Sequence, residues 1–164
     1  TAKRKNKSSR FASNPCDLGS DVLEGEAVFV NNEGVHLGLR SEVTPHRLPA
    51  RLTWEDFRFG MLVCHQAFIA KRSIAPLFNL HYKLSSDIDW EIRVLKKSQT
   101  ILKSKAPICH YLMGGASVQN LQRSWKERYE VLKSHFGLRP NLFNHLVIIG
   151  RGLIFAFKKQ GKYW

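Results

Sequence analysis

Two aspartates in this sequence stand where a carboxylate could do chemistry. Asp87 and Asp89 are the only acids between Asp56 and Glu91, and serines precede them at positions 85 and 86. A serine before an apolar-periodic segment predicts a helix start, so both acids fall in a first helical turn. There a carboxylate either complements the helix dipole or acts as a general base toward a hydroxyl nucleophile. Side chains two residues apart on a helix point in different directions, so at most one of them can face a given pocket.

A His-Gln pair inside an apolar segment is the second candidate. His65 and Gln66 follow Cys64, and a buried histidine beside a glutamine is usually a hydrogen-bonded polar pair of the core. The neighbours Cys64-His65 and Cys109-His110 do not predict zinc, because adjacent strand residues face opposite sides and the chain has no C-x-x-C spacing. The sequence also has no P-loop and no G-x-G-x-x-G motif, so it does not predict nucleotide binding by those routes.

Several short motifs, taken in order, carry a resemblance to a known family. They are Gly25-Glu26, Gly38-Leu39-Arg40, Pro45-His46-Arg47-Leu48-Pro49, Cys64-His65-Gln66-Ala67-Phe68, Ser85-Ser86-Asp87-Ile88-Asp89-Trp90, Gly114-Gly115-Ala116-Ser117 and Lys126-Glu127-Arg128. In order and spacing, the segment from about Ser20 to Gly137 resembles the C-terminal half of a family 2 glycosyltransferase. The similar enzymes are bacterial and build polysaccharides and lipid-linked oligosaccharides.

The resemblance implies a GT-A fold and roles for the matching positions. Asp87 would be the catalytic base that deprotonates the acceptor hydroxyl for inverting attack on the anomeric carbon of the sugar. The implied substrate-binding residues are His65, Gln66, Asp89, Trp90, Arg93, Gly114, Gly115 and Ser117. The first two would line the cleft, and the next three would shape the helix behind it. The last three would form a turn that closes over the diphosphate, where backbone N–H groups suit an anion.

The sequence also departs from the family. Such enzymes carry an N-terminal half with nucleotide-binding strands and a metal-binding Asp-x-Asp motif, whereas only a basic tail precedes Ser20 here. Asp17 and Asp21 do not stand in that context, so no metal ligand is assigned. The resemblance implies a divalent cation, Mg²⁺ or Mn²⁺, and transfer from a nucleotide-sugar donor to a saccharide or lipid-linked acceptor in the intact enzyme. Alone, the chain is expected to be inactive.

The elements that must position these residues alternate between strand and helix. A hairpin is expected over residues 21–39, a helix start at Thr53, a buried strand over 61–70 and a helix from Ser85 or Ser86. A strand over 100–113 and an amphipathic helix over 118–136, ended by Gly137, complete the pattern. The expected class is therefore α/β, a partial GT-A fold with a hairpin, a mixed sheet and C-terminal helices.

Three regions follow from these patterns: a basic tail or upstream remnant over 1–19, an acceptor-side domain over 20–137, and an apolar and basic C-terminal helix over 138–164. Residues 142–157 are too short and interrupted for a comfortable membrane span. With Lys158, Lys159, Lys162, Tyr163 and Trp164 after them, they resemble an interfacial helix, and the alternative is a helix packed on the sheet.

Charge and composition limit the function classes. The 164 residues have a net charge of +13, but five of the 26 basic residues lie in residues 1–10 and nine in residues 121–164. This distribution leaves the middle nearly neutral and does not favour a folded nucleic-acid-binding face. Three scattered cysteines argue against a disulfide-framed secreted module and for a reducing compartment. We expect a cytoplasmic location, either free or peripheral on the inner face of an anionic membrane. A basic nucleic-acid-binding protein and a non-catalytic membrane-surface remnant remain the alternatives.

Overall fold

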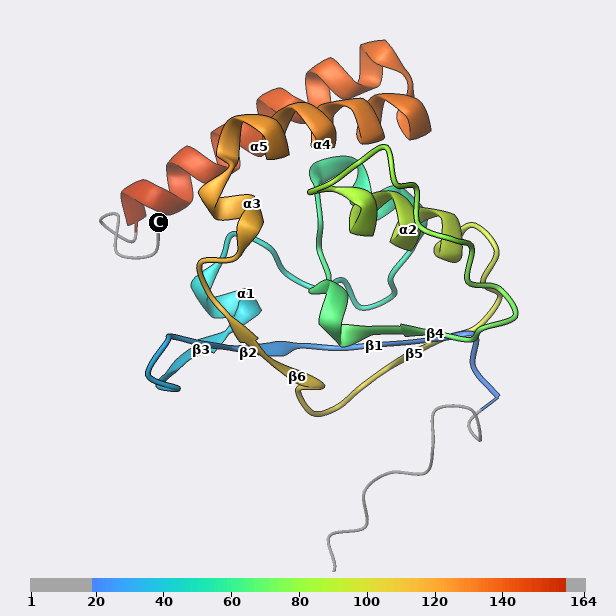
Figure 1. Cartoon of the computed structure of the whole chain (residues 1–164), viewed down its shortest axis with the longest axis horizontal. Coiled ribbons are helices and arrows are strands. Elements are labelled where there is room, and N and C mark those ends of the chain that lie inside the picture. The colour runs from blue at the N-terminus through green and yellow to red at the C-terminus, as the bar shows by residue number, and fades with distance from the viewer. Residues whose placement is uncertain (1–18, 159–164) are drawn as a thin grey trace, which may run out of the picture.

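Two three-stranded sheets lie end to end along one extended run of the chain (Figure 1). The computed structural model describes residues 19–158, with the side chains at 116 and 118 left out. Strands β1 (Val22–Glu24) and β2 (Ala27–Val30) occupy that run and are the central strands of the two sheets. Most of the basic tail expected over residues 1–19, and the lysines and aromatics after Lys158, lie outside the described residues.

Each central strand has one antiparallel and one parallel neighbour. Strand β1 pairs antiparallel with β4 (Phe68–Ala70) and parallel with β5 (Ile101–Lys103). Strand β2 pairs antiparallel with β3 (His36–Leu39) and parallel with β6 (Cys109–Leu112). The two sheets are therefore both mixed, and they repeat one pairing pattern.

A glycine joins the two sheets at a point of close backbone approach. A Cβ atom placed on Gly25 would come within 3.0 Å of the side chains of Ile108 and Ser104. The backbone N–H of Ser104 donates to the carbonyl of Glu24 at 2.7 Å, and the N–H of Ile108 donates to the carbonyl of Glu26 at 2.8 Å. The chain over residues 104–108 thus crosses directly over this glycine, which only a residue without a side chain allows.

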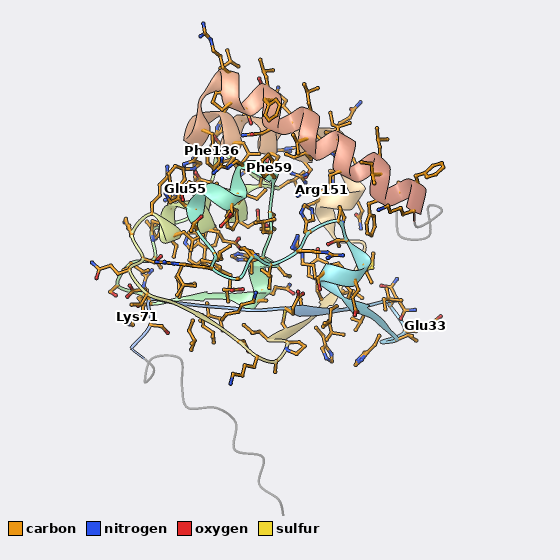
Figure 2. The ribbon with its side chains drawn as sticks, turned by 180° about the vertical axis from the view of Figure 1, so that it is seen from behind. Glu33, Glu55, Phe59, Lys71, Phe136 and Arg151 are labelled. Carbon is orange, nitrogen blue, oxygen red and sulfur yellow. The ribbon has the colours of Figure 1, made fainter. Side chains whose placement is uncertain are left out.

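The described helices all lie on one side of the sheets (Figure 1). They are α1 (Arg40–Val43), α2 (Ser86–Leu95), α3 (Ala116–Gln119), α4 (Leu121–Phe136) and α5 (Leu138–Lys158), with 3-10 helices η2 (Trp54–Phe59) and η3 (His65–Ala67). The main core lies between this helical layer and β1, where Phe57, Ile92 and Leu132 are fully buried. Figure 2 labels Phe136, the last residue of α4, whose ring stacks on that of Trp54 in η2 at a centroid distance of 5.4 Å.

Several expected elements are confirmed. The hairpin is β2–β3, where the Asn31 side-chain oxygen accepts from the N–H groups of Glu33 and Val35. The helix start at Thr53 is η2, with the Asp56 carboxylate accepting from both the N–H and the hydroxyl of Thr53 at 2.8 Å. The helix after Ser85 is α2, and α4 ends before Gly137, whose φ of +83° suits glycine.

Two strand predictions are wrong in part. Residues 61–67 are not strand. The Arg40 guanidinium donates to the carbonyls of Met61, at 2.8 Å, and Leu62, so these two carbonyls do not pair with a neighbouring strand. Strand pairing begins only at Phe68. Residues 100–113 form two strands rather than one, because the chain breaks to cross Gly25.

The predicted helix over 118–136 also forms in two pieces. Helix α3 begins at Ala116 and ends at Gln119, and α4 begins at Leu121 after Asn120. The last helix, α5, packs against α4 and η2, which separate most of it from the sheets (Figure 1). The fold is accordingly mixed α/β with C-terminal helices, as predicted, and its strands form two small mixed sheets where one was expected.

Candidate functional site

Asp87 lies in the first turn of α2 and lines a cavity of about 180 Å³. Its Oδ1 accepts from the backbone N–H of Ile88 at 2.8 Å, which fixes the carboxylate over the helix start. Burial raises the pKa of Asp87, while that hydrogen bond and the nearby His65 and Arg128 oppose the rise. A carboxylate whose charged form is partly desolvated is a better proton acceptor than one in water. Asp87 therefore has the placement and the basicity that a general base requires.

Asp89 does not line this cavity. Its two oxygens pair with Arg93 at 2.8 Å and with Nε2 of His135 at 2.9 Å, and its side chain is buried between α2 and α4. The expectation that only one of the two carboxylates faces a given pocket fits this geometry. Asp89 and Arg93 thus hold the rear of α2, and the Arg93 guanidinium also donates to the carbonyl of Leu77 at 2.9 Å.

A histidine and a fully buried glutamate form a pair beside Asp87. His65 Nδ1 lies 3.3 Å from Oε1 of Glu91, one turn after Asp87 on α2. The hydrogen bond to Glu91 raises the pKa of His65, and burial raises the pKa of Glu91 to about 7. The rings of Phe78 and Trp90 meet the His65 ring edge-on, at centroid distances of 5.7 Å. These contacts therefore hold the His65 ring in one orientation, and the hydrogen bond to Glu91 favours its protonated form.

Arginines supply the positive charge of this cavity. Arg40 is buried at the start of α1, and Arg128 enters from α4. Burial lowers the pKa of the Arg128 guanidinium, and the opposing charge is that of Asp87. Nε of Arg128 is buried and has no hydrogen-bond partner within the described part of the chain. His46 lies beside Arg40, and burial together with that arginine lowers its pKa well below the usual value, so it is neutral at pH 7.

The other residues implied by the resemblance are distributed unevenly. Of that set, His65, Asp87 and Ser117 line the cavity. Gln66 is exposed and absent from the cavity wall, and Trp90 Nε1 donates to the carbonyl of Pro76 at 2.7 Å. Gly114 has a φ of +87° and, with Gly115, forms the turn that leads into α3. The fold thus brings three of the predicted residues to one cavity and leaves Gln66 exposed outside it.

Sequence reasoning gave no role to Glu91, Tyr111, Arg40, His46 or Arg128, although the last three lie inside the quoted motifs. Glu91 had a usable signal, because it stands four residues after Asp87 and so shares its helix face. Tyr111 comes from β6 and lines the same cavity.

No group of three or more His, Cys, Asp or Glu side chains able to hold a metal ion occurs among residues 19–158. Cys64 and Cys109 are free thiols near each other, and burial together with Cys64 raises the pKa of Cys109 to about 11. The described residues therefore offer no ligand set for the divalent cation that the resemblance implies.

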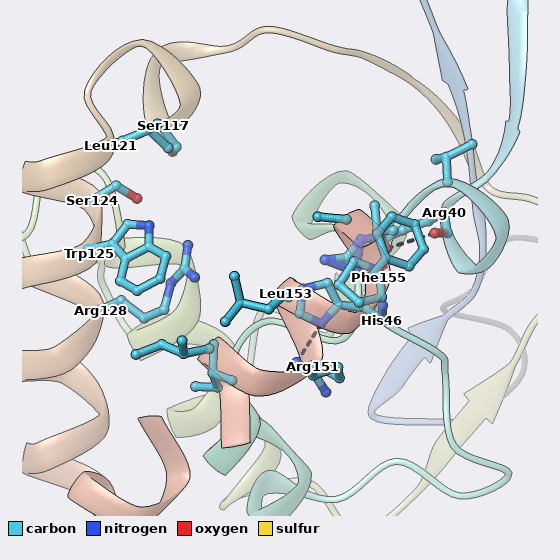
Figure 3. Close-up of a pocket in the computed structure, with 17 residues that line it drawn as sticks. Arg40, His46, Ser117, Leu121, Ser124, Trp125, Arg128, Arg151, Leu153 and Phe155 are labelled. Carbon is cyan, nitrogen blue, oxygen red and sulfur yellow. Dashed lines mark hydrogen bonds between the residues drawn. The ribbon is translucent and has the colours of Figure 1, made fainter. Parts of the chain in front are cut away.

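A larger cavity of about 480 Å³ adjoins the first. The two share Arg40, His46, Ser117, Ser124 and Arg128 in their walls. Figure 3 shows Trp125 and Arg128 on one side and His46 and Phe155 on the other, with Leu153 between them.

Arg151 anchors α5 at this larger cavity. Its guanidinium donates to the carbonyl of Phe59 at 2.7 Å and lies 3.2 Å from Nδ1 of His46.

The polarity of α5 is inverted with respect to an ordinary surface helix. Its buried residues are Asn141 and Asn144, and Asn141 donates to the carbonyl of Tyr129 at 3.1 Å. Its exposed face is apolar and includes Phe143 (65% exposed) and Leu146 (68%). By length and composition the helix could also cross a membrane, with a mean hydropathy of 1.2 over its most apolar 18-residue window. Most of the apolar side chains of α5 thus point outward, whereas its two fully buried side chains are polar.

Comparison of the chain with protein-family models, with curated proteins and with solved structures found no match. The assignment of a function therefore rests on the geometry of the two cavities and of α5.

Proposed function

We propose that residues 20–137 are the acceptor-side half of a family 2 glycosyltransferase of GT-A type, with Asp87 as the general base. One observation carries the proposal: Asp87 lies in a cavity beside the cations Arg40 and Arg128. A base for the acceptor hydroxyl and positive charge for a departing diphosphate are the two needs of inverting glycosyl transfer.

In the proposed reaction, the hydroxyl proton and the electron pair of the broken bond each have a stated destination. The acceptor hydroxyl gives its proton to the Asp87 carboxylate while its oxygen forms a bond to the anomeric carbon. The bond from that carbon to the diphosphate oxygen breaks, and the nucleoside diphosphate leaves with the electron pair. The guanidinium of Arg128 offers an unpaired N–H to the developing negative charge. His65, held by Glu91, lies beside the carboxylate and favours its charged form before transfer.

The donor side of the reaction belongs to a part that the described residues do not supply. A Mg²⁺ or Mn²⁺ ion on the donor diphosphate is part of the proposal, but residues 19–158 offer no ligands for it, and no step above depends on it. The sheet face opposite the helices supports a further layer. There Ile69 and Leu102 flank Leu23 in register and are both exposed.

We also propose that α5 attaches the protein to the cytoplasmic face of an anionic membrane. A helix with buried asparagines and outward leucines and phenylalanines has its apolar face against lipid rather than against a core. The His46 and Phe59 contacts of Arg151 hold the middle of the helix against the protein, which favours lying in the interface over spanning it.

The decisive test of the base compares two substitutions in the polypeptide encoded by the complete reading frame. Asp87→Asn is expected to lower turnover by about 10²–10⁴-fold with little change in donor binding, because it removes the proton acceptor and keeps the shape. Asp89→Asn is the matched control on the same turn, and its turnover should change far less. If the Asp87→Asn protein released nucleoside diphosphate at the wild-type rate, this would contradict the assignment of Asp87 as the general base.

The membrane proposal has its own test. Sedimentation with vesicles containing phosphatidylglycerol should retain the chain, and Leu146→Lys should weaken retention, because it places a charge in the apolar face. Lys126→Gln, an exposed change on α4, is the control. Equal retention of the wild type and Leu146→Lys would exclude α5 as the contact.

A further inference from the structure

The wall of the larger cavity has a cationic part and an apolar part. One part of the lining is cationic, with Arg40, Arg128 and Arg151 and no acidic residue. The rest is mainly apolar and comes from α4 and α5, with Leu121, Trp125, Ile148, Leu153 and Phe155. Such a site complements a ligand with an anionic part and a hydrocarbon part.

Two of the arginines carry donors that the protein leaves unused. The Nε atoms of Arg128 and Arg151 are both buried, and neither has a hydrogen-bond partner within residues 19–158. A buried donor without an acceptor is costly, so such groups usually meet a ligand or water. Phosphate oxygens satisfy guanidinium donors with both charge and geometry. The two donors come from α4 and α5, on either side of the cavity (Figure 3).

The apolar part of the cavity reaches the exposed face of α5 that we propose contacts the membrane. Leu153, which is 66% exposed, and Ile149, which is 41% exposed, both line the cavity. On the other side, Leu121 and Trp125 of α4 line the cavity and are also exposed. A hydrocarbon chain can therefore stay in the lipid while the group attached to it lies between the arginines.

We propose that this cavity binds the phosphate or diphosphate of a lipid-linked acceptor, whose chain leaves along α5. The proposal rests on the glycosyltransferase function above and selects the lipid-linked class over a free saccharide. Arg40, Arg128 and Ser117 belong to both cavities. A phosphate held between Arg128 and Arg151 consequently lies next to the cavity of Asp87, where a sugar attached to it presents its hydroxyl to the base.

Binding to the 164-residue chain tests the proposal without any need for turnover. The probes are farnesyl phosphate below its micelle concentration, farnesol and inorganic phosphate, with affinity measured by titration calorimetry. Farnesyl phosphate is expected to bind at least about tenfold more tightly than either partial probe, because only it fills both parts of the cavity. Equal affinity for inorganic phosphate, or for farnesol, overturns the amphiphile assignment.

Variants locate the site. Arg128→Gln and Arg151→Gln should each weaken farnesyl phosphate roughly 10- to 100-fold, because each removes a charged donor. Arg139→Gln, exposed on α5 and outside the cavity wall, is the matched control. Because Arg151 also holds the carbonyl of Phe59, Leu153→Glu is the second probe of that wall and should weaken binding as well. Wild-type affinity in Arg128→Gln and Leu153→Glu overturns the site.

Asp87→Asn separates this proposal from the catalytic one. It should bind farnesyl phosphate as the wild type does, since Asp87 lies in the other cavity. Full turnover by Asp87→Asn would refute the role of Asp87 as general base without bearing on the lipid site. Loss of farnesyl phosphate binding in every variant, Arg139→Gln included, would refute the lipid site without bearing on Asp87.

Discussion

Replacing Glu91 with glutamine should change how the stability of the fold depends on pH. Glu91 is fully buried in α2, and burial raises its pKa from the ordinary 4.5 to about 7. Below pH 4.5 the folded and unfolded states both carry its proton. Between pH 4.5 and 7 the unfolded state releases that proton and the folded state keeps it, so folding becomes less favourable as the pH rises.

The magnitude follows from the two pKa values. The difference between 4.5 and about 7 corresponds to about 3 kcal/mol of stability lost across that range. The pKa of His65 is raised by its bond to Glu91, so its contribution is present below pH 6.5 and is also lost as the pH rises. Both groups therefore act in the same direction, and Glu91→Gln removes both effects. For a chain of this size, about 3 kcal/mol is roughly 6–12 °C in Tm.

The assay is thermal unfolding of the wild type and Glu91→Gln at pH values from 4.5 to 8. Relative to Glu91→Gln, the wild type should lose about 3 kcal/mol between the two ends of the range. Glu33→Gln, at an exposed turn position, is the control for loss of a carboxylate as such. A constant difference between wild type and Glu91→Gln would refute the raised pKa. A difference that grows in favour of the wild type with pH would mean that His65 holds Glu91 as a stabilised carboxylate.

Four further outcomes are expected. Asp89→Asn should lower the free energy of unfolding by about 1–3 kcal/mol, because it leaves a partly buried histidine and arginine with a weaker partner, and chemical denaturation measures it. Thr53→Ala should cost about 0.5–2 kcal/mol in the same assay by removing the hydroxyl bonded to Asp56. The 164-residue chain should release no nucleoside diphosphate from common nucleotide sugars with Mg²⁺ or Mn²⁺. Clear turnover would contradict the proposal that the donor side of the site belongs to another part of the protein. Any affinity for DNA should fall steeply with salt and vanish when residues 1–10 and the basic C-terminal end are removed; sequence-selective binding that persists would favour the nucleic-acid alternative.

Local chemistry made part of the fold predictable. Thr53 and Gly137 mark helix boundaries by interactions with their own neighbours in sequence, and the structure has helix ends at both. The Asn31 turn is equally local, since its side chain bonds to residues two and four positions later. Such features depend little on the rest of the chain and are therefore readable without it.

The missed features depend on contacts between distant segments. Residues 61–67 have the composition of a strand, but Arg40, more than 20 positions earlier, donates to the carbonyls of Met61 and Leu62. Hydrophobic periodicity cannot show this, because it reports side chains and not the fate of backbone oxygens. Within the candidate site, Asp87 and His65 were chosen from motifs, whereas Glu91 became a candidate only when the fold placed it behind His65.

For α5 the sequence left two alternatives open, an interfacial helix and a helix packed on the sheet. An apolar stripe on a helix predicts a buried face, and nothing in the sequence says which face meets the protein. Asn141 and Asn144 identify it only once their burial against α4 is seen.

The repeated pairing of the central strands has a consequence for how the chain is made. Strands β1 and β2 are synthesised about 80 residues before their parallel partners β5 and β6. At roughly 5–20 residues per second, each central strand has one unpaired edge for several seconds or more during synthesis. Only the antiparallel neighbours β3 and β4 are available in the interval. The order of assembly is therefore hairpin first and parallel edge last, and a pause in translation between β4 and β5 should expose the nascent chain to edge-to-edge association with other copies.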